Sequence, residues 1–326
     1  MAESQNIATM AERLSKELFA EFLWTRVGPA NVNWPCPDNS VHQMATHPSD
    51  VVFYYDEPYF QTRTYVTCDL KSYAKGTIGA ATIRNSIERL SAAHACADKS
   101  DDFRSKFVHN HTSFEICSLL FVYNHDGAYD SDFSKIIDDV NLDKLEVPKD
   151  SKLVVLGPKD IHWLNNVRLD IQTLRGQGSL PSRDKCRFFY PHLVRRKNVQ
   201  PEKARAATLE MLTAPWIIFT YEHPDDESRR GYLVYYRRPG ETVEEFLYLI
   251  DYLLHYQAVF KNTDVRVRML SPHVNAPAHF AKAIDEYIES CGGGEEVRIL
   301  LKSVACTTMT NIATVFSEIE IGMDVR

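Results

Sequence analysis

Tyr65-Val66-Thr67-Cys68-Asp69-Leu70-Lys71-Ser72-Tyr73 is the most informative segment of this sequence. Its β-branched and aromatic residues predict a strand. Successive side chains of a strand point to opposite faces, so Asp69 and Lys71 share one face while the other face is apolar. The segment therefore predicts a strand with one chemically active face and one face in the core.

A second acidic residue lies upstream of this strand. Asp50 precedes the strand-like run Val51–Tyr55, and a turn at 56–58 separates that run from the next one, Thr62–Lys71. The two runs predict a hairpin that brings Asp50 and Asp69 together. Two carboxylates can hold a divalent metal, which neutralises phosphate charge and lowers the pKa of bound water. A lysine beside them would hold or activate that water, so the pattern indicates phosphodiester hydrolysis.

The acid-x-lysine tripeptide alone carries little information. About two matches are expected by chance in a chain with 44 acidic residues among 326, and two occur. The second, Asp150-Ser151-Lys152, lies in a polar stretch that predicts a loop. Only the first match combines a strand, an upstream acid and a following helix.

The flanking segments predict the surrounding elements. Apolar residues at helical spacing predict an amphipathic helix over residues 5–25 and a second helix through Ile83, Ile87, Leu90 and Ala93. An apolar strand over Phe114–Tyr123 follows. The expected order is helix, strands, helix, strand.

These residues resemble the PD-(D/E)XK nuclease superfamily over roughly residues 5–125. The resemblance implies an α/β fold with a restriction-endonuclease-like α-β-β-β-α-β core. It also implies that Asp50 and Asp69 are metal ligands, that the Leu70 backbone carbonyl is a further ligand, and that Lys71 is the catalytic lysine. The implied cofactor is Mg²⁺ or Mn²⁺.

Members of this superfamily often add a glutamate from the first helix. Glu17 is most similar to that pattern, as a catalytic and metal-binding residue, and Glu21 one turn later is its competitor. The chain departs from the commonest form twice: a serine separates Pro48 from Asp50, and aspartate takes the place of the more frequent glutamate in the acid-x-lysine unit.

The same residues also have a structural interpretation. Asp50 could cap a turn, Asp69 and Lys71 could form a surface ion pair, and Glu17 could lie on a solvated helix face. The alternative function is then a non-catalytic nuclease-like module that binds nucleic acid or protein in a multi-subunit assembly. The presence of both acids and the lysine favours the enzyme.

Length and composition predict a soluble protein of two domains. A chain of 326 residues with 44% hydrophobic residues exceeds the size at which one core usually keeps growing. We expect a nuclease domain over residues 1–130 and a second α/β domain over 131–326 for substrate contact or subunit assembly. No export segment or membrane-spanning run is evident, which predicts a cytoplasmic protein. Seven cysteines without Cys-x-x-Cys spacing predict buried thiols and argue against a zinc knuckle.

A basic segment with interleaved aromatic residues predicts a nucleic-acid contact despite the net charge of −7. We expect phosphate contacts from Arg183, Lys185, Arg187, Arg195, Arg196 and Lys197. A solvated basic loop, or a surface for an acidic partner protein, is the alternative for this segment.

The remaining pattern alternates strands and helices. Strands are expected over 153–156, 216–221, 232–237, 265–270 and 297–302, and helices over 160–174, 242–260 and 276–290. No phosphate-binding glycine loop accompanies them, so an ATP-driven motor is not expected. The sequence thus predicts a metal-dependent DNA nuclease. The resemblance further suggests phage defence, with a partner protein subunit or a second copy of the chain.

Overall fold

The computed structural model describes residues 2–109, 113–191, 204–291 and 294–312. The chain forms two compact units, which divide between Leu164 and Asn165. The predicted division at residue 130, with its assignment of roles, stays a prediction.

A five-stranded mixed sheet forms the centre of the first unit, in the order β1-β4-β5-β6-β7. The strands are β1 (Thr25–Val27), β4 (Val51–Asp56), β5 (Arg63–Tyr73), β6 (Phe114–Asn124) and β7 (Leu153–Leu156). The first three pair antiparallel, whereas β5, β6 and β7 run parallel. The hairpin predicted from the sequence is therefore present as β4 and β5.

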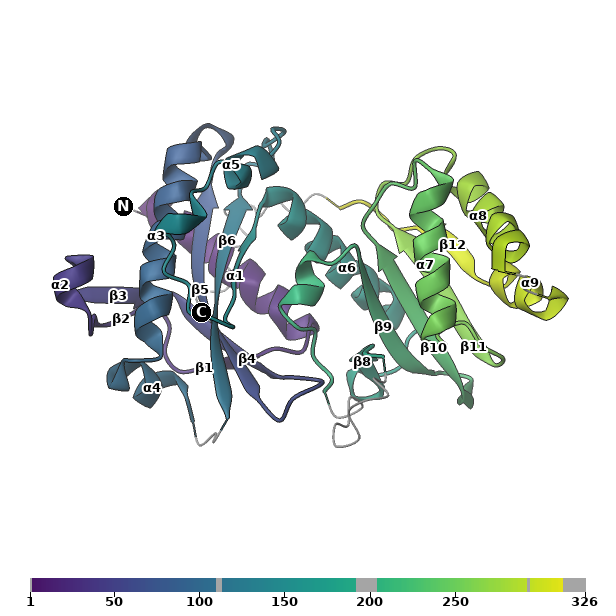
Figure 1. The fold of residues 1–326 in the computed structure, drawn as a ribbon, viewed down its shortest axis with the longest axis horizontal. Coiled ribbons are helices and arrows are strands. Elements are labelled where there is room, and N and C mark those ends of the chain that lie inside the picture. Colours follow the sequence, from purple (N-terminus) through teal and green to yellow (C-terminus); the bar gives the residue numbers. More distant parts are fainter. Residues whose placement is uncertain (1, 110–112, 192–203, 292–293, 313–326) are drawn as a thin grey trace. The chain divides into compact units, whose positions relative to one another are not determined.

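Helices cover both faces of this sheet, as Figure 1 shows for α1 (Ala2–Glu21) and α3 (Ala80–Ala97). Phe53 packs its ring on Phe19 of α1, and the neighbouring Val52 shares an apolar cluster with Ala93 of α3. Adjacent side chains of β4 thus point to opposite faces of the sheet, as expected for successive residues of a strand. β6 is buried from Ile116 to Asn124, because it lies inside the sheet with both faces covered.

A small extension lies beside the sheet. It consists of the two-stranded hairpin β2 (Val32–Pro35) and β3 (Thr46–Ser49), with the short helix α2 (Asn39–His42) between the strands. Trp34 of β2 packs edge-on against Phe103 of α4 (Asp101–Phe107). β3 ends at Ser49, so this extension leads directly into Asp50 and β4. The short helix α5 (Ser134–Asp138) follows β6.

The second unit has its own five-stranded sheet, in the order β12-β11-β10-β9-β8. The strands are β8 (Cys186–Phe188), β9 (Trp216–His223), β10 (Asp226–Tyr236), β11 (Thr263–Met269) and β12 (Ala305–Thr308). Helices α7 (Val243–His255) and α8 (Ala276–Cys291) form one apolar core with β9, β10 and β11. Asp170 of α6 (Pro158–Gly176) accepts hydrogen bonds from Tyr235 and Arg268, which lie on β10 and β11.

The two sheets have the same topology. In the second unit β8, β9 and β10 pair antiparallel, and β10, β11 and β12 run parallel. α7 connects the first parallel pair of this sheet, as α3 does in the first unit, and a long helix precedes each sheet. Both units therefore follow the α-β-β-β-α-β order that the sequence predicted for the first alone.

The α/β fold class is confirmed, and three element predictions need correction. α1 ends at Glu21, and Thr25–Val27 forms β1 instead of the last helical turn. The expected strand at 297–302 is the helix α9 (Glu295–Lys302), and β12 was missed. Among the described helices, none combines the length and apolar character that crossing a membrane requires.

Candidate active site

The backbone of β5 fixes the position of the Asp50 carboxylate. Asp50 lies between β3 and β4, and its Oδ2 accepts a hydrogen bond of 2.7 Å from the backbone N–H of Leu70. Leu70 separates Asp69 from Lys71, so this bond places the first acid beside the acid-x-lysine unit. The sequence prediction that Asp50 and Asp69 meet is consistent with this geometry.

Asp69 and Lys71 lie on the same face of β5 and form an ion pair. Lys71 Nζ is 2.6 Å from Asp69 Oδ1, and the two side chains are 31% and 20% exposed. A half-buried, charge-assisted contact of this length is stronger than a fully solvated pair. The lysine is thereby held at the carboxylates but remains accessible to solvent.

Burial, and to a smaller extent the neighbouring carboxylate, make Asp50 a weaker acid than an exposed aspartate. Burial raises the pKa of Asp50 to about 6, the Leu70 N–H opposes this increase, and the negative charge of Asp69 adds to it. Ionised Asp50 is therefore less favourable in the fold than in water, and a cation beside it would offset this cost.

Lys71 supplies part of that compensation. Burial lowers the pKa of Lys71, but the carboxylates of Asp69 and Asp50 outweigh burial, and the pKa ends above its usual value. Lys71 is thus a cation at neutral pH. One lysine beside two carboxylates still leaves a net negative site.

The donor atoms fit a hard divalent cation. Asp50 and Asp69 offer carboxylate oxygens and Leu70 offers a backbone carbonyl, which is the oxygen set that Mg²⁺ and Mn²⁺ prefer. The raised pKa of Asp50 is the observation that calls for positive charge at this point. The residues present are therefore compatible with the metal that the resemblance implies.

Ser49 connects the hairpin extension to the site, a role that the sequence did not predict. Its Oγ accepts a hydrogen bond of 3.1 Å from Trp34 Nε1 and lies 3.1 Å from the hydroxyl of Thr67 on β5. All three residues are buried. The serine that interrupts the usual proline-acid pair thus joins β3 to β5 directly before Asp50.

We expect Ser49→Ala to destabilise the protein by about 1–3 kcal/mol, because the buried Trp34 N–H loses its acceptor. The free energy of unfolding from urea titration measures this change. Ser105→Ala is the control, since the Ser105 hydroxyl is exposed and bonds within its own helix, and a change within about 0.5 kcal/mol is expected. Equal effects of both variants would contradict the anchoring role.

The two candidate glutamates of α1 differ in burial. Glu17 is paired with Arg13 at 3.1 Å, and its side chain is 34% exposed. Glu21 is only 1% exposed, on a helix that packs against β5. Burial therefore favours Glu21 as the inward-facing acid of the two.

The second sheet carries no acids at the corresponding positions. In the first sheet Val51, at the start of β4, pairs with Cys68 of β5. Asp50 and Asp69 are the next residues beyond this pair. In the second sheet Trp216 pairs with Tyr236, and the outside residues are Pro215 and Arg237. The position matching Lys71 holds Pro239. The acidic site therefore belongs to the first unit, and the shared topology does not repeat it.

The predicted nucleic-acid residues lie partly around a pocket of the second unit. Lys185 and Arg187 line a cavity of about 240 Å³ together with Arg205 and Arg230, and Lys185 is 3.5 Å from Glu222. The remaining predicted contact in the described chain, Arg183, offers its carbonyl to the Arg205 guanidinium, which also bonds the carbonyls of Asp184 and Cys186. Arg195, Arg196 and Lys197 lie outside the described residues.

Two of these arginines lie near the same hydroxyl. Burial raises the pKa of Tyr232, and the charges of Arg230 and Arg187 oppose this increase. The guanidinium groups of Arg230 on β10 and Arg187 on β8 therefore both contribute to the positive electrostatic potential at this hydroxyl. Such a potential is suited to a phosphate group.

Residues 1–160 match the family model described as GAPS4 protein PD-(D/E)XK nuclease domain. The matched range contains the acidic site on β4 and β5. No significant similarity to a curated protein or to a solved structure was found.

Proposed function

We propose that this protein is a DNA nuclease, because residues 1–160 belong to the family of GAPS4 PD-(D/E)XK nuclease domains. GAPS4 is a phage-defence system protein. Membership implies phosphodiester hydrolysis. The observation that supports this function most strongly is the contact of the Asp50 carboxylate with the β5 backbone between Asp69 and Lys71. These residues form a compact site of two acids and one lysine.

In the proposed mechanism, Asp50, Asp69 and the Leu70 carbonyl would hold Mg²⁺ or Mn²⁺, and Glu17 or Glu21 would assist. The bound metal would stabilise charge on the scissile phosphate and lower the pKa of a water molecule. Lys71, protonated and held at Asp69, donates hydrogen bonds that position the attacking water or the phosphate. The burial of Glu21 makes it our preferred assistant over the more exposed Glu17.

The test is incubation of the purified protein with linear and closed circular DNA, with and without Mg²⁺ or Mn²⁺. Metal-dependent loss of either DNA supports the proposal, and the comparison of the two topologies shows whether ends are required. The same assay with RNA tests the substrate class. Absence of cleavage, also in the presence of a co-purified partner, would contradict the function.

The raised pKa of Asp50 predicts that metal binding weakens in acid. The metal binds the ionised carboxylate and competes with the proton that Asp50 holds below pH 6 or so. We expect the Mn²⁺ affinity, measured by titration calorimetry, to be nearly constant above about pH 7 and to fall about tenfold per unit below about pH 6. Asp50→Asn should bind Mn²⁺ weakly and without this pH dependence.

The raised pKa of Asp50 also determines how the stability of the metal-free protein changes with pH. The folded value of about 6 lies above the ordinary aspartate value of 3.8, so the protonated carboxyl stabilises the metal-free fold below about pH 4. This contribution is lost as pH rises through 6. Mn²⁺ should therefore raise the melting temperature more at neutral pH than at about pH 5. An equal increase at both pH values would contradict the role of Asp50.

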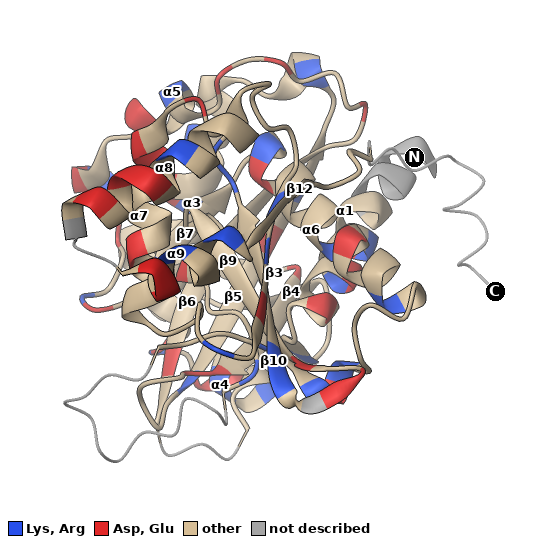
Figure 2. Cartoon of the chain, turned by 90° about the vertical axis from the view of Figure 1, so that its right-hand side faces the viewer, with Lys and Arg blue, Asp and Glu red and all other residues tan. Residues whose placement is uncertain are grey.

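The pocket of the second unit is proposed as a phosphate contact for the DNA. Figure 2 shows acidic residues on α7, α8 and α9, whereas β10 carries Arg229 and Arg230 next to Asp226 and Glu227. The assignment is supported by four cations against two acids, Asp184 and Glu222, in the pocket lining.

We expect the double substitution Arg187→Ala and Arg230→Ala to weaken DNA binding most at low salt. Losing about two phosphate contacts should reduce the slope of log affinity against log salt by about 2 units. Fluorescence anisotropy over a salt series measures this slope. Arg298→Ala is the control, because Arg298 pairs with Asp285 outside the pocket and should leave the slope unchanged.

A further inference from the structure

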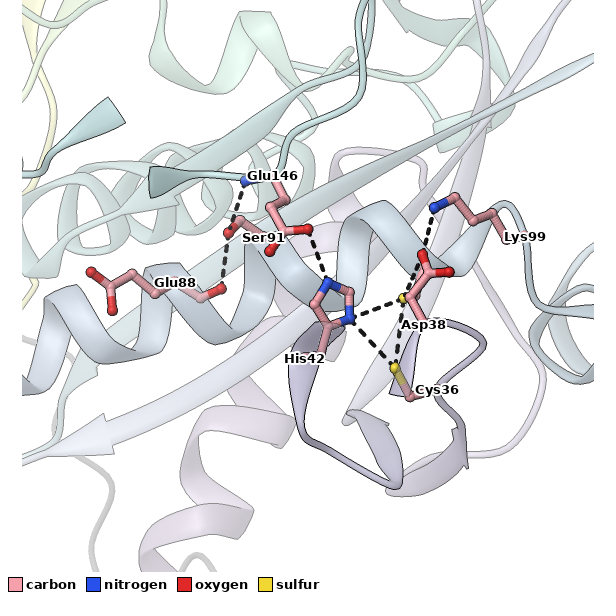
Figure 3. A network of polar contacts seen from close by, with 8 residues as sticks. Cys36, Asp38, His42, Glu88, Ser91, Lys99 and Glu146 are labelled. Atoms are coloured by element: carbon pink, nitrogen blue, oxygen red, sulfur yellow. Dashed lines mark hydrogen bonds and ion pairs between the residues drawn. The ribbon is translucent and has the colours of Figure 1, made fainter. Parts of the chain in front are cut away.

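Four potential metal ligands converge beside the hairpin extension of the first unit. Cys36 follows β2, His42 ends α2, His47 lies on β3 and Cys96 lies in the last turn of α3. One ligand atom from each residue lies within 4.8 Å of every other. Figure 3 shows the ring of His42 in contact with the sulfur of Cys36.

The distances among Cys36, His42 and Cys96 are those expected of three ligands at a tetrahedral site, and His47 lies within 4.8 Å of all three. The Cys36 and Cys96 Sγ atoms are 3.8 Å apart, and His42 Nδ1 is 3.4 Å from the first and 3.3 Å from the second. Zinc bonds of about 2.3 Å to sulfur and about 2.05 Å to nitrogen, at tetrahedral angles, place two sulfurs about 3.8 Å apart and sulfur and nitrogen about 3.5 Å apart. A disulfide requires about 2.05 Å, so this sulfur separation fits shared ligation of a metal better.

His47 provides an independent indication. Its side chain is fully buried, and neither ring nitrogen has a hydrogen-bond partner in the part of the chain that the structure describes. An unsatisfied buried polar atom costs about 1–3 kcal/mol, so such groups are uncommon without a function. Metal coordination would give one of these nitrogens a partner, and the His47 ring lies 5.5 Å from that of His42.

The second ring nitrogen of His42 is oriented by an acid. Glu146 Oε2 lies 2.9 Å from His42 Nε2, as Figure 3 shows. This carboxylate places the proton on Nε2 and leaves the lone pair of Nδ1 directed at the two sulfurs. A carboxylate behind a histidine ligand is the usual support of zinc sites.

We propose that Cys36, His42, His47 and Cys96 bind a structural Zn²⁺ ion. Four protein ligands complete the coordination sphere, and three of the four residues are buried, so the site leaves no position for a substrate or a reactive water. Two thiolates and two imidazoles select zinc over the magnesium that suits the oxygen ligands at Asp50 and Asp69.

The position of the zinc gives it a role in the fold. It ties the β2–β3 hairpin to the end of α3, across 60 residues between the two cysteines. His47 precedes Ser49 by two residues on the same face of β3, and Asp50 follows. The zinc therefore fixes the strand that delivers the first acid of the proposed active site.

The first experiment is metal analysis of the full chain, purified without chelators and without a metal-affinity column. We expect about one zinc per chain by plasma mass spectrometry. Cys96→Ser and His47→Asn should lose zinc. Cys117→Ser is the matched control, because this buried thiol on β6 lies outside the cluster, and Asp69→Asn should also retain zinc.

Cobalt exchange keeps the test valid where a ligand variant fails to fold. Co²⁺ bound to the wild-type protein should show the intense visible bands of tetrahedral coordination and a thiolate charge-transfer band. A folded wild-type chain that purifies without zinc and takes up no tetrahedral Co²⁺ would overturn the proposal. Mass-spectrometric detection of a Cys36–Cys96 disulfide as the main state would overturn it as well.

Discussion

Asp69→Asn should reduce metal-dependent DNA cleavage by at least about a thousandfold. The carboxylate of Asp69 is one of two acids at the proposed metal, and metal stabilisation of phosphate charge is worth several kcal/mol, at about 1.36 kcal/mol for each factor of ten in rate. The asparagine keeps the size of the side chain and an oxygen that can accept from Lys71, so the fold should persist. The loss is measured as initial rates at saturating Mg²⁺.

The second acid-x-lysine match provides a matched control for this substitution. Asp150 lies in a loop, is exposed and has φ of 65°, a conformation that asparagine tolerates well. Asp150→Asn should therefore cleave DNA at the wild-type rate. Comparable losses in Asp69→Asn and Asp150→Asn, or full activity of Asp69→Asn, would remove Asp69 from the mechanism.

The sequence predicted the acidic site because local patterns were sufficient there. Alternation along β5 determines that Asp69 and Lys71 share a face, and a short turn after β4 makes a hairpin the simplest pairing. The structure adds the contact between Asp50 and the Leu70 N–H, which no pattern of residues indicates. The same holds for the burial that distinguishes Glu21 from Glu17.

The hairpin extension was not predicted because it is held together by contacts between residues far apart in the sequence. Its strands are only four residues long and contain prolines, which read as a loop in the sequence. Ser49 becomes buried against Thr67, 18 residues away, and Cys36 meets Cys96 on α3. Cysteine spacing therefore argued against zinc, while the folded chain brings the ligands together from separate elements.

The strand prediction at 297–302 was wrong because it rested on a short apolar run. Residues 297–302 are rich in β-branched and aliphatic side chains, which favoured a strand. Glu295 and Glu296 follow Gly294 and stabilise a helix N-terminus, and Leu301 is buried while Ile299 is 61% exposed, as one face of a helix requires. The sequence also did not predict that the two sheets share one topology, because the second sheet lacks the acids by which the first was recognised.

Lys71→Met should reduce cleavage by about a hundredfold to ten-thousandfold and leave DNA binding nearly unchanged. The two neighbouring carboxylates raise the pKa of Lys71 against the effect of burial, so the side chain acts as a cation that donates hydrogen bonds and not as a neutral base. Lys71→Arg keeps the charge and should recover part of the rate. A neutral base would instead require the wild-type rate to keep rising up to the pKa of the lysine, whereas a cation requires a plateau through about pH 9.

Three measurements separate these possibilities: single-turnover rates over pH, DNA affinity by anisotropy, and the rate of Lys152→Met as control. Lys152 is the lysine of the loop match and should be dispensable for cleavage. A loss of DNA affinity equal to the loss of rate would assign Lys71 to binding. An unchanged rate would remove Lys71 from the mechanism and leave its ion pair with Asp69 a structural role. Rate loss at constant affinity, with a plateau in pH and partial recovery by arginine, is the result that the geometry of β5 leads us to expect.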